Sequence, residues 1–223
     1  EVAENDVDKT FTLQMVHQGY IEPHNATAHW DEDDRIKVWT STQGAFPVRT
    51  STAAILDMDV SRIKVTPLEI GGGFGGKIPV YLEPVVSILS KKSGRPVKAI
   101  MERSNVFQAS GPAPGGTITV KMGTDKDANI IAAETSIKLE AGGFPGAAVG
   151  AAVQCIFAPY DIPNTRIDGY DIVVNKPKSA AYRAPGSPQA AFAAETVSDE
   201  LARIHNMDPI DFRLQNASKE DTR

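Results

Sequence analysis

The sequence predicts an α+β fold in which helices pack on mixed or antiparallel sheets. Short segments alternate apolar and polar side chains and come in neighbouring pairs joined by polar turns, as in hairpins. Longer segments carry apolar side chains at the spacing of amphipathic helices. Strands and helices do not alternate regularly, so a doubly wound parallel sheet is not favoured. The 223 residues suffice for one large domain or two small ones.

Turn residues and helix signals place the expected elements of the first half. An acidic turn at residues 31–34 joins two strands, and it lacks the alternating ligands and the glycine of a calcium loop. Pro47 is tolerated in the first turn of a helix, and Ser93-Gly94 ends another helix. We expect strands at residues 10–20, 26–30, 36–40, 62–69 and 96–101, and helices at residues 47–58 and 80–92.

The second half is expected to hold two strands joined by the polar turn at residues 124–129, a third strand, and helices between glycine-rich loops. Those loops cover residues 141–146 and 179–189. Asp208 is a good N-cap and Pro209 suits the first helical position. The expected strands are residues 117–122, 130–139 and 166–174, and the expected helices are residues 147–157, about 190–205, and a short one from residue 208.

Bulk composition excludes several functional classes. The net charge of −5 gives no basic footprint for nucleic acid, and no apolar run approaches the roughly 20 residues that span a bilayer. Cys155 is the only cysteine, so the sequence offers neither a disulfide framework nor a cysteine-based metal site. A reducing, cytoplasmic setting is therefore expected. Because the sequence starts at Glu1 without methionine, we expect an internal piece of a longer chain.

The most informative stretch is the glycine loop, residues 71–77 (GGGFGGK), which follows an expected strand. Glycines let backbone N–H groups approach a bulky ligand closely. Two nucleotide-binding patterns fit it literally. However, Ile78 stands where a phosphate loop needs Ser or Thr, and Pro79 suits only the very start of a helix. The dinucleotide fingerprint needs an early strand–helix–strand unit, and the preceding chain is hairpin-like. A tight structural turn is the plainer alternative.

Three motifs together show a resemblance to the molybdenum hydroxylases. They are Thr42-Gln43, the glycine loop, and the segment YRAPGSPQ at residues 182–189. The chain resembles the molybdopterin-binding large subunit of the xanthine dehydrogenase and aldehyde oxidase family, from residue 11 to residue 216. The segment at residues 18–24, QGYIEPH, belongs to the resemblance as well. This implies that residues 1–223 form one molybdopterin-binding module, with room for two subdomains, within a larger catalytic subunit.

The resemblance implies site residues. Gln43 and Arg183 match the family's catalytic glutamine and arginine, and both are expected to touch the cofactor. The remaining cofactor-binding residues implied are Gly72, Gly73, Phe74, Gly75 and Ala184. No protein side chain is expected to ligate the molybdenum, because the dithiolene of the pterin holds it. Without the resemblance, Gln43 reads as an ordinary residue at a strand end, and Arg183 as one half of a structural ion pair.

The resemblance also implies an activity: oxidation of an aldehyde, N-heterocycle or aromatic substrate, with water as oxygen source. Electrons would leave through iron–sulfur clusters to a flavin, both on other domains or subunits. Ile78, Ala151 and Pro185 replace contacts that purine oxidisers use, which argues against a purine substrate. The family's base is a glutamate in a Gly-x-Gly-Glu motif, which this sequence lacks, so the isolated chain is expected to be inactive. A non-catalytic binding or assembly module and a nucleotide-binding protein are the alternatives.

Overall fold

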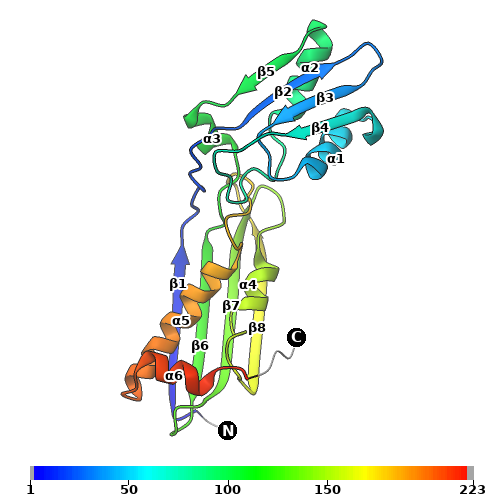
Figure 1. The fold of residues 1–223 in the computed structure, drawn as a ribbon. Helices are drawn as coiled ribbons and strands as arrows, with labels where there is room; N and C mark the ends of the chain where they lie inside the picture. Colours follow the sequence, from blue (N-terminus) through cyan, green and yellow to red (C-terminus); the bar gives the residue numbers. More distant parts are fainter. Residues whose placement is uncertain (1–2, 220–223) are drawn as a thin grey trace. The chain divides into compact units, whose positions relative to one another are not determined.

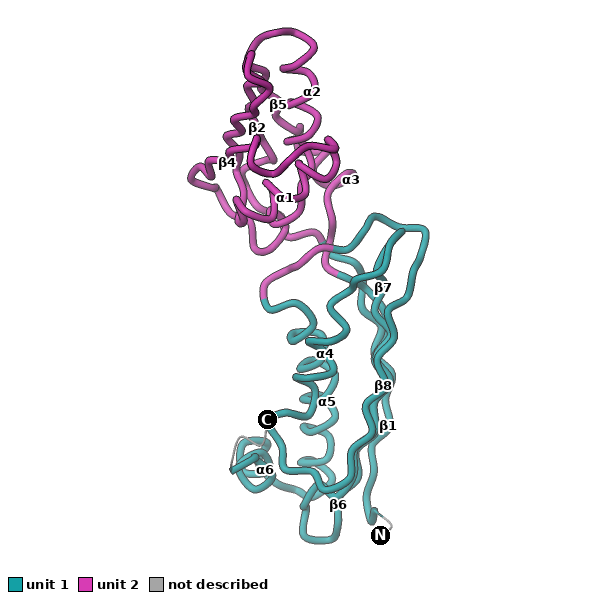
Figure 2. The backbone as a smooth tube through the Cα atoms, turned by 90° about the vertical axis from the view of Figure 1, so that its right-hand side faces the viewer, with its two compact units in different colours: residues 1–16, 114–179, 184–223 teal, residues 17–113, 180–183 magenta. Residues whose placement is uncertain are grey.

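The computed structural model describes residues 3–219 and divides the chain into two compact units (Figures 1 and 2). Unit 2 contains His17–Ala113 and Ala180–Arg183, and unit 1 contains the rest. Unit 2 is thus an insertion between the first strand of unit 1 and its continuation. Unit 2 also includes four residues, Ala180–Arg183, of the glycine-rich loop at residues 179–189. All the expected site residues except Ala184 fall in unit 2.

Unit 1 is built on a four-stranded sheet with the order β1-β6-β7-β8. β1 (Asn5–Leu13), β6 (Gly116–Thr124) and β7 (Ile130–Gly142) are antiparallel neighbours, and β8 (Asn164–Val173) runs parallel to β7. Parallel neighbours require a crossover, which here includes α4 (Val149–Cys155). The sheet is therefore mixed, and β8 forms its exposed edge.

Helices cover one face of this sheet (Figure 2). α5 (Ser187–Ile204) packs against β1 and β6, and it can lie close because much of its buried face is alanine. α6 (Pro209–Asn216) begins as expected, with the Asp208 side chain accepting from the Ile210 N–H at 2.8 Å. Asn216 then ties this helix to β7, since its side chain accepts from the Ile130 N–H at 2.7 Å.

Unit 2 has its own four-stranded sheet, with the order β4-β3-β2-β5. The expected hairpin is confirmed, because β2 (Asn25–Trp30) and β3 (Ile36–Thr40) pair antiparallel. β5 (Val97–Ile100) is antiparallel to β2, and β4 (Ile63–Pro67) is parallel to β3. The connection from β3 to β4 contains α1 (Ala45–Leu56) and the short helix η1 (Val60–Arg62).

The core of unit 2 lies between this sheet and helices α1 and α2 (Glu83–Ser93). It is formed by the alternate inward side chains of β2 and β3, with Ile63 and Val86. α2 packs on β2, and α1 on β4. Gly94 ends α2 in the left-handed conformation (φ 64°), as the Ser93-Gly94 signal predicts.

The α+β fold with mixed sheets is confirmed, and the differences from the sequence prediction are local. The strand expected at residues 10–20 instead covers Asn5–Leu13, because β6 supplies its partners only there. The apolar–polar alternation continues past Leu13, but the described residues 14–20 form at most an isolated bridge at Val16. The short helix α3 (Arg103–Ala109) was not predicted. None of the helices in residues 3–219 is long and apolar enough to cross a membrane.

Candidate functional site

The glycine loop lies between β4 and α2 and folds as a tight turn. Phe74 and Gly75 have positive φ values of 52° and 99°, and the Gly76 N–H donates to the Gly73 carbonyl at 2.8 Å. A phenylalanine in the left-handed region is uncommon. It is held there because its carbonyl accepts a hydrogen bond from the Arg183 N–H at 2.9 Å. The loop is therefore fixed from outside as well as by its own turn.

The glycines are required by close packing as much as by conformation. A Cβ at Gly75 would lie 2.7 Å from the Cβ of Ala181, and one at Gly73 would lie 2.6 Å from Gln43 Oε1. At Gly76 it would lie 2.7 Å from the Tyr20 ring. Larger residues would push these neighbours away. The glycine content thus allows the loop to press against Gln43 on one side and the Arg183 segment on the other.

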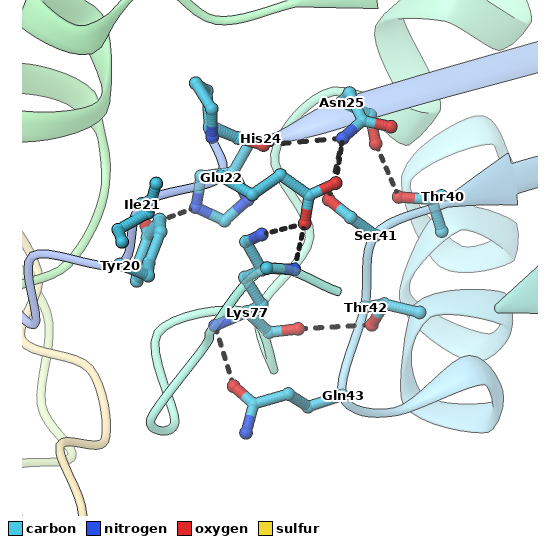
Figure 3. Close-up of polar contacts among 12 residues, drawn as sticks. Tyr20, Ile21, Glu22, His24, Asn25, Thr40, Ser41, Thr42, Gln43 and Lys77 are labelled. Atoms are coloured by element: carbon cyan, nitrogen blue, oxygen red, sulfur yellow. Dashed lines mark hydrogen bonds and ion pairs between the residues drawn. The ribbon is translucent and has the colours of Figure 1, made fainter. Parts of the chain in front are cut away.

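Gln43 follows β3, and its carboxamide is oriented by the glycine loop. Its Oε1 accepts from the Gly75 N–H at 2.9 Å and from the Lys77 N–H at 3.1 Å. Its own backbone N–H donates to the Lys77 carbonyl at 3.0 Å. With both acceptor sites of the oxygen used, Nε2 points away from the loop, as Figure 3 shows. Among residues 3–219 no group accepts from Nε2, so the side chain presents an outward donor.

Arg183 is anchored through its backbone, which leaves its side chain available. Besides the hydrogen bond to Phe74, its segment is held by the Ala180 N–H, which donates to the Pro112 carbonyl at 2.8 Å. Gln18 Nε2 donates to the Ala181 carbonyl, also at 2.8 Å. The Arg183 side chain is exposed and has no ion-pair partner within the described chain. The structural ion pair that the sequence allowed for Arg183 is therefore not formed.

The backbone of the loop adds further donors. The N–H groups of Gly72, Gly73 and Phe74 make no hydrogen bond within residues 3–219, whereas that of Gly75 is used by Gln43. Three free amides, one carboxamide donor and one guanidinium come from the same unit. Such a set suits an oxygen-rich anionic ligand. The described residues contain no cluster of His, Cys, Asp and Glu that could hold a metal ion by itself.

Ala184 is the one expected site residue that lies outside this group. It belongs to unit 1 and has a φ of 55°. The contacts described above do not extend to it. Its positive φ, like that of Phe74, is unusual for a residue with a side chain. The role expected for Ala184 in cofactor binding therefore stays a prediction.

A buried polar cluster supports the loop, and sequence reasoning missed it. The Lys77 side chain has no exposed surface, and its ammonium lies 2.7 Å from Glu22 Oε2 (Figure 3). The same carboxylate accepts from the Gly71 N–H at 2.8 Å. Burial raises the pKa of the Glu22 carboxyl, but the hydrogen bonds from Lys77, Gly71 and Asn25 outweigh this and lower it below its usual value. No local signal links positions 22 and 77, which are 55 residues apart.

Tyr20 and His24 continue the cluster on the other side of Lys77. The Tyr20 hydroxyl lies 2.6 Å from His24 Nε2, and the Lys77 ammonium lies 5.1 Å from the centre of the Tyr20 ring. Burial, the Lys77 charge and His17 lower the pKa of His24 to about 4. His24 is therefore neutral at pH 7, and the Tyr20 hydroxyl can donate to it. His24 is thus a buried residue whose ring has a hydrogen-bond partner.

The position of Lys77 bears on one of the two nucleotide-binding patterns, the phosphate loop. In a phosphate loop the lysine must reach the phosphates. Here its ammonium is directed into the protein and paired with Glu22. A phosphate loop is thus excluded by the position of this side chain, in addition to the sequence argument from Ile78 and Pro79.

The donors of unit 2 are of a kind that suits a large anionic ligand, and the family of the chain agrees with this. The sequence matches the family model of the molybdopterin cofactor-binding domain over residues 1–217, and the chain belongs to this family. It is 30% identical to the nicotinate dehydrogenase large molybdopterin subunit of Eubacterium barkeri, covering 95% of this chain and 50% of that protein. It is also 30% identical to the aldehyde oxidoreductase molybdenum-binding subunit PaoC of Escherichia coli K12, covering 96% of this chain and 29% of that protein.

Solved structures agree with the family. Quinoline 2-oxidoreductase from Pseudomonas putida 86 matches with a TM-score of 0.91 and 27% identity, covering 99% of this chain and 29% of that chain. The aldehyde oxidoreductase of Desulfovibrio gigas matches with a TM-score of 0.92 and 27% identity, covering 99% and 25%. The chain thus spans half or less of each of the proteins named here.

Proposed function

We propose that residues 1–223 form a single molybdopterin-binding module of a molybdenum hydroxylase. This enzyme would oxidise an aldehyde, an N-heterocycle or an aromatic substrate with water as oxygen source. The observation that carries the proposal is the Gln43 carboxamide. Its oxygen is fixed by two backbone amides of the glycine loop, and its nitrogen is free to donate. Because the Gln43 amide is already oriented before a ligand binds, it needs little reorganisation to stabilise negative charge that develops during the reaction.

The residues of unit 2 would hold the cofactor from one side. When bound, the molybdenum cofactor supplies the two-electron chemistry of the hydroxylation. Gln43 Nε2 and the amides of Gly72, Gly73 and Phe74 would donate to oxygen atoms near the metal. The exposed guanidinium of Arg183 would bind a substrate carbonyl or carboxylate, or a cofactor oxygen, as a permanently charged fork. For Ala184, the next residue along the chain, contact with the cofactor is proposed from the resemblance alone.

The side chains in and directly after the glycine loop argue against a purine substrate. Ile78 is 43% exposed, and its N–H donates to the Gly75 carbonyl at 3.3 Å, so it directly follows the turn of the loop. Phe74 is 45% exposed in the same loop. Neither side chain could hydrogen-bond the heteroatoms of a purine.

Turnover would require parts that these residues do not supply. The sequence contains no Gly-x-Gly-Glu motif for the base and no cysteine set for iron–sulfur clusters. We therefore propose that the module works with the rest of a large subunit, and with iron–sulfur and flavin domains or subunits. By itself the chain would bind the cofactor weakly and would not reduce a dye in the presence of substrate.

The experiment compares site variants with matched controls in the full enzyme that contains this chain. Gln43→Ala and Arg183→Ala are expected to lower kcat by about a hundredfold or more while the fold is retained. Gln108→Ala and Arg35→Ala serve as controls, because both side chains are exposed in unit 2 and form no hydrogen bond or ion pair there. Full activity in both site variants would overturn the site assignment. Dye reduction by the isolated chain would overturn the proposed need for the missing base.

A further inference from the structure

The segment at residues 18–24 has no role in the proposed function, although it carries several buried polar side chains. Among the residues of this segment, Glu22 is only partly buried and hydrogen-bonds the glycine loop directly. Glu22 Oε2 accepts from the Gly71 N–H at 2.8 Å and from the Lys77 ammonium at 2.7 Å. One carboxylate oxygen therefore holds the first and the last residue of the loop together. The Asn25 side chain donates to the other carboxylate oxygen at 3.0 Å, which fixes the carboxylate itself.

The backbone of Lys77 is the link from this ion pair to Gln43. Its N–H donates to Gln43 Oε1 at 3.1 Å, and its carbonyl accepts from the Gln43 N–H at 3.0 Å. The same carbonyl accepts from the Thr42 hydroxyl at 3.1 Å. Lys77 thus holds both the main chain and the carboxamide of Gln43. Figure 3 shows its hydrogen bond to the carboxamide. The position of the Lys77 backbone in turn depends on where its buried ammonium is bound.

A role in stability alone does not explain this arrangement. The Lys77 ammonium is fully removed from water and the Glu22 side chain is 30% exposed. Burying an ammonium is costly, and a buried ion pair is often no more stabilising than an apolar pair of similar volume. Such a pair does impose one geometry, because any other position leaves a buried charge without a partner. The Lys77 ammonium also lies over the Tyr20 ring, which further restricts the positions that the ammonium can take.

We propose that Glu22 and Lys77 are positioning residues, which set the orientation of the Gln43 carboxamide before the cofactor binds. The consequence for cofactor affinity rests on the proposed function, whereas the positioning itself does not. Glu22→Gln removes the negative charge while keeping the shape of the side chain. Lys77→Met removes the positive charge while keeping most of the apolar stem. Both changes are expected to free the end of the glycine loop and, with it, the carboxamide of Gln43.

The test measures order at Gln43 in the chain without cofactor. In ¹⁵N-labelled protein, hydrogen exchange of the Gly75 and Lys77 amides reports the two bonds that orient Gln43 Oε1. In Glu22→Gln and Lys77→Met we expect exchange at both amides to rise about tenfold or more, with unchanged exchange in β2 and β3. Glu69→Gln and Lys64→Met are the matched controls, since both side chains are exposed in unit 2, and they should leave all these rates unchanged.

A double variant, Glu22→Leu with Lys77→Met, separates positioning from stability and covers the case in which a single variant fails to fold. It leaves no unpaired buried charge, so unit 2 is expected to remain folded. Exchange at Gly75 and Lys77 should nevertheless stay raised. Protection at these two amides equal to that of the unaltered chain, in the double variant or in both single variants, would overturn the proposal.

A second readout is the affinity of the chain for isolated molybdopterin cofactor, which we expect to fall about tenfold in Glu22→Gln, in proportion to the loss of the oriented form. Raised exchange with unchanged affinity would overturn the link from positioning to binding. If the unaltered chain does not bind the cofactor at all, the proposed function fails, and the exchange rates still decide the positioning role.

Discussion

Acidification should destabilise unit 2 through one buried histidine. His24 is 6% exposed, and its pKa is lowered from 6.5 to about 4 by burial, by the Lys77 charge and by His17, with Glu22 acting in the opposite sense. Because the folded-state pKa is the lower one, the unfolded chain binds the proton more readily. The stability contributed by neutral His24 is therefore complete above pH 6.5 and is lost as the pH falls towards 4.

The size of this destabilisation follows from the shift in the pKa of His24. A pKa difference of about 2.5 units at about 1.4 kcal/mol per unit gives about 3 kcal/mol for the whole transition. About 2 kcal/mol of this should be lost between pH 7 and pH 5. The His24→Gln variant cannot gain a proton in this range, and its amide still offers Tyr20 a hydrogen-bond partner. Its free energy of unfolding should change by about 2 kcal/mol less over the same interval.

Tryptophan fluorescence provides the assay, because both tryptophans, Trp30 and Trp39, lie in unit 2. Urea unfolding followed at this signal reports unit 2 without assuming that the two units unfold together. The comparison is the loss of stability between pH 7 and pH 5 in the unaltered chain and in His24→Gln. Equal losses in the two proteins would refute the reasoning, since buried neutral His24 would then contribute nothing to the pH dependence.

Two further predictions concern glycine packing and a helix anchor. Gly75→Ala should destabilise unit 2 by about 2 kcal/mol or more, because its φ is 99° and a Cβ would meet Ala181 at 2.7 Å. Gly94→Ala, with a φ of 64° and open space around it, should cost only about 1 kcal/mol in the same urea assay; equal costs would contradict the packing argument. Asn216→Ala should destabilise unit 1 by about 3 kcal/mol in urea unfolding followed by circular dichroism, because the Ile130 N–H and the Ala128 carbonyl would lose a buried partner. A loss below about 0.5 kcal/mol would show that this anchor is dispensable.

Local chemistry made parts of the fold predictable. The acidic turn at residues 31–34 indicated the β2–β3 hairpin, and Asp208-Pro209 indicated the start of α6. The parallel pairing of β3 with β4 could not be predicted, because both strands have the same alternation whichever direction they run. The strand expected to reach residue 20 ended at Leu13 for a similar reason, since its length depends on the extent of β6.

In the candidate site, too, some residues could be predicted from the sequence and others could not. Resemblance selected Gln43, the glycine loop and Arg183, and the structure brings their backbones together in unit 2. Glu22 and Lys77 were overlooked as a pair, because an ion pair between distant positions leaves no pattern in a single sequence. In the sequence, Lys77 stands out only as part of a phosphate-loop pattern. Its pairing with Glu22 depends on the fold of the glycine loop, which turns the ammonium inwards.

The insertion of unit 2 between β1 and β6 has a consequence for the order of folding. Leu13 pairs with Gly116, so the pairing of β1 with β6 must close a loop of about a hundred residues. For a flexible chain the entropy of closing such a loop costs about 4 kcal/mol. If unit 2 folds first, most of those residues are already ordered and the effective loop is much shorter. We therefore expect the inserted unit to act as a folding nucleus, with the sheet of unit 1 completing afterwards at a rate set by how early the insertion forms.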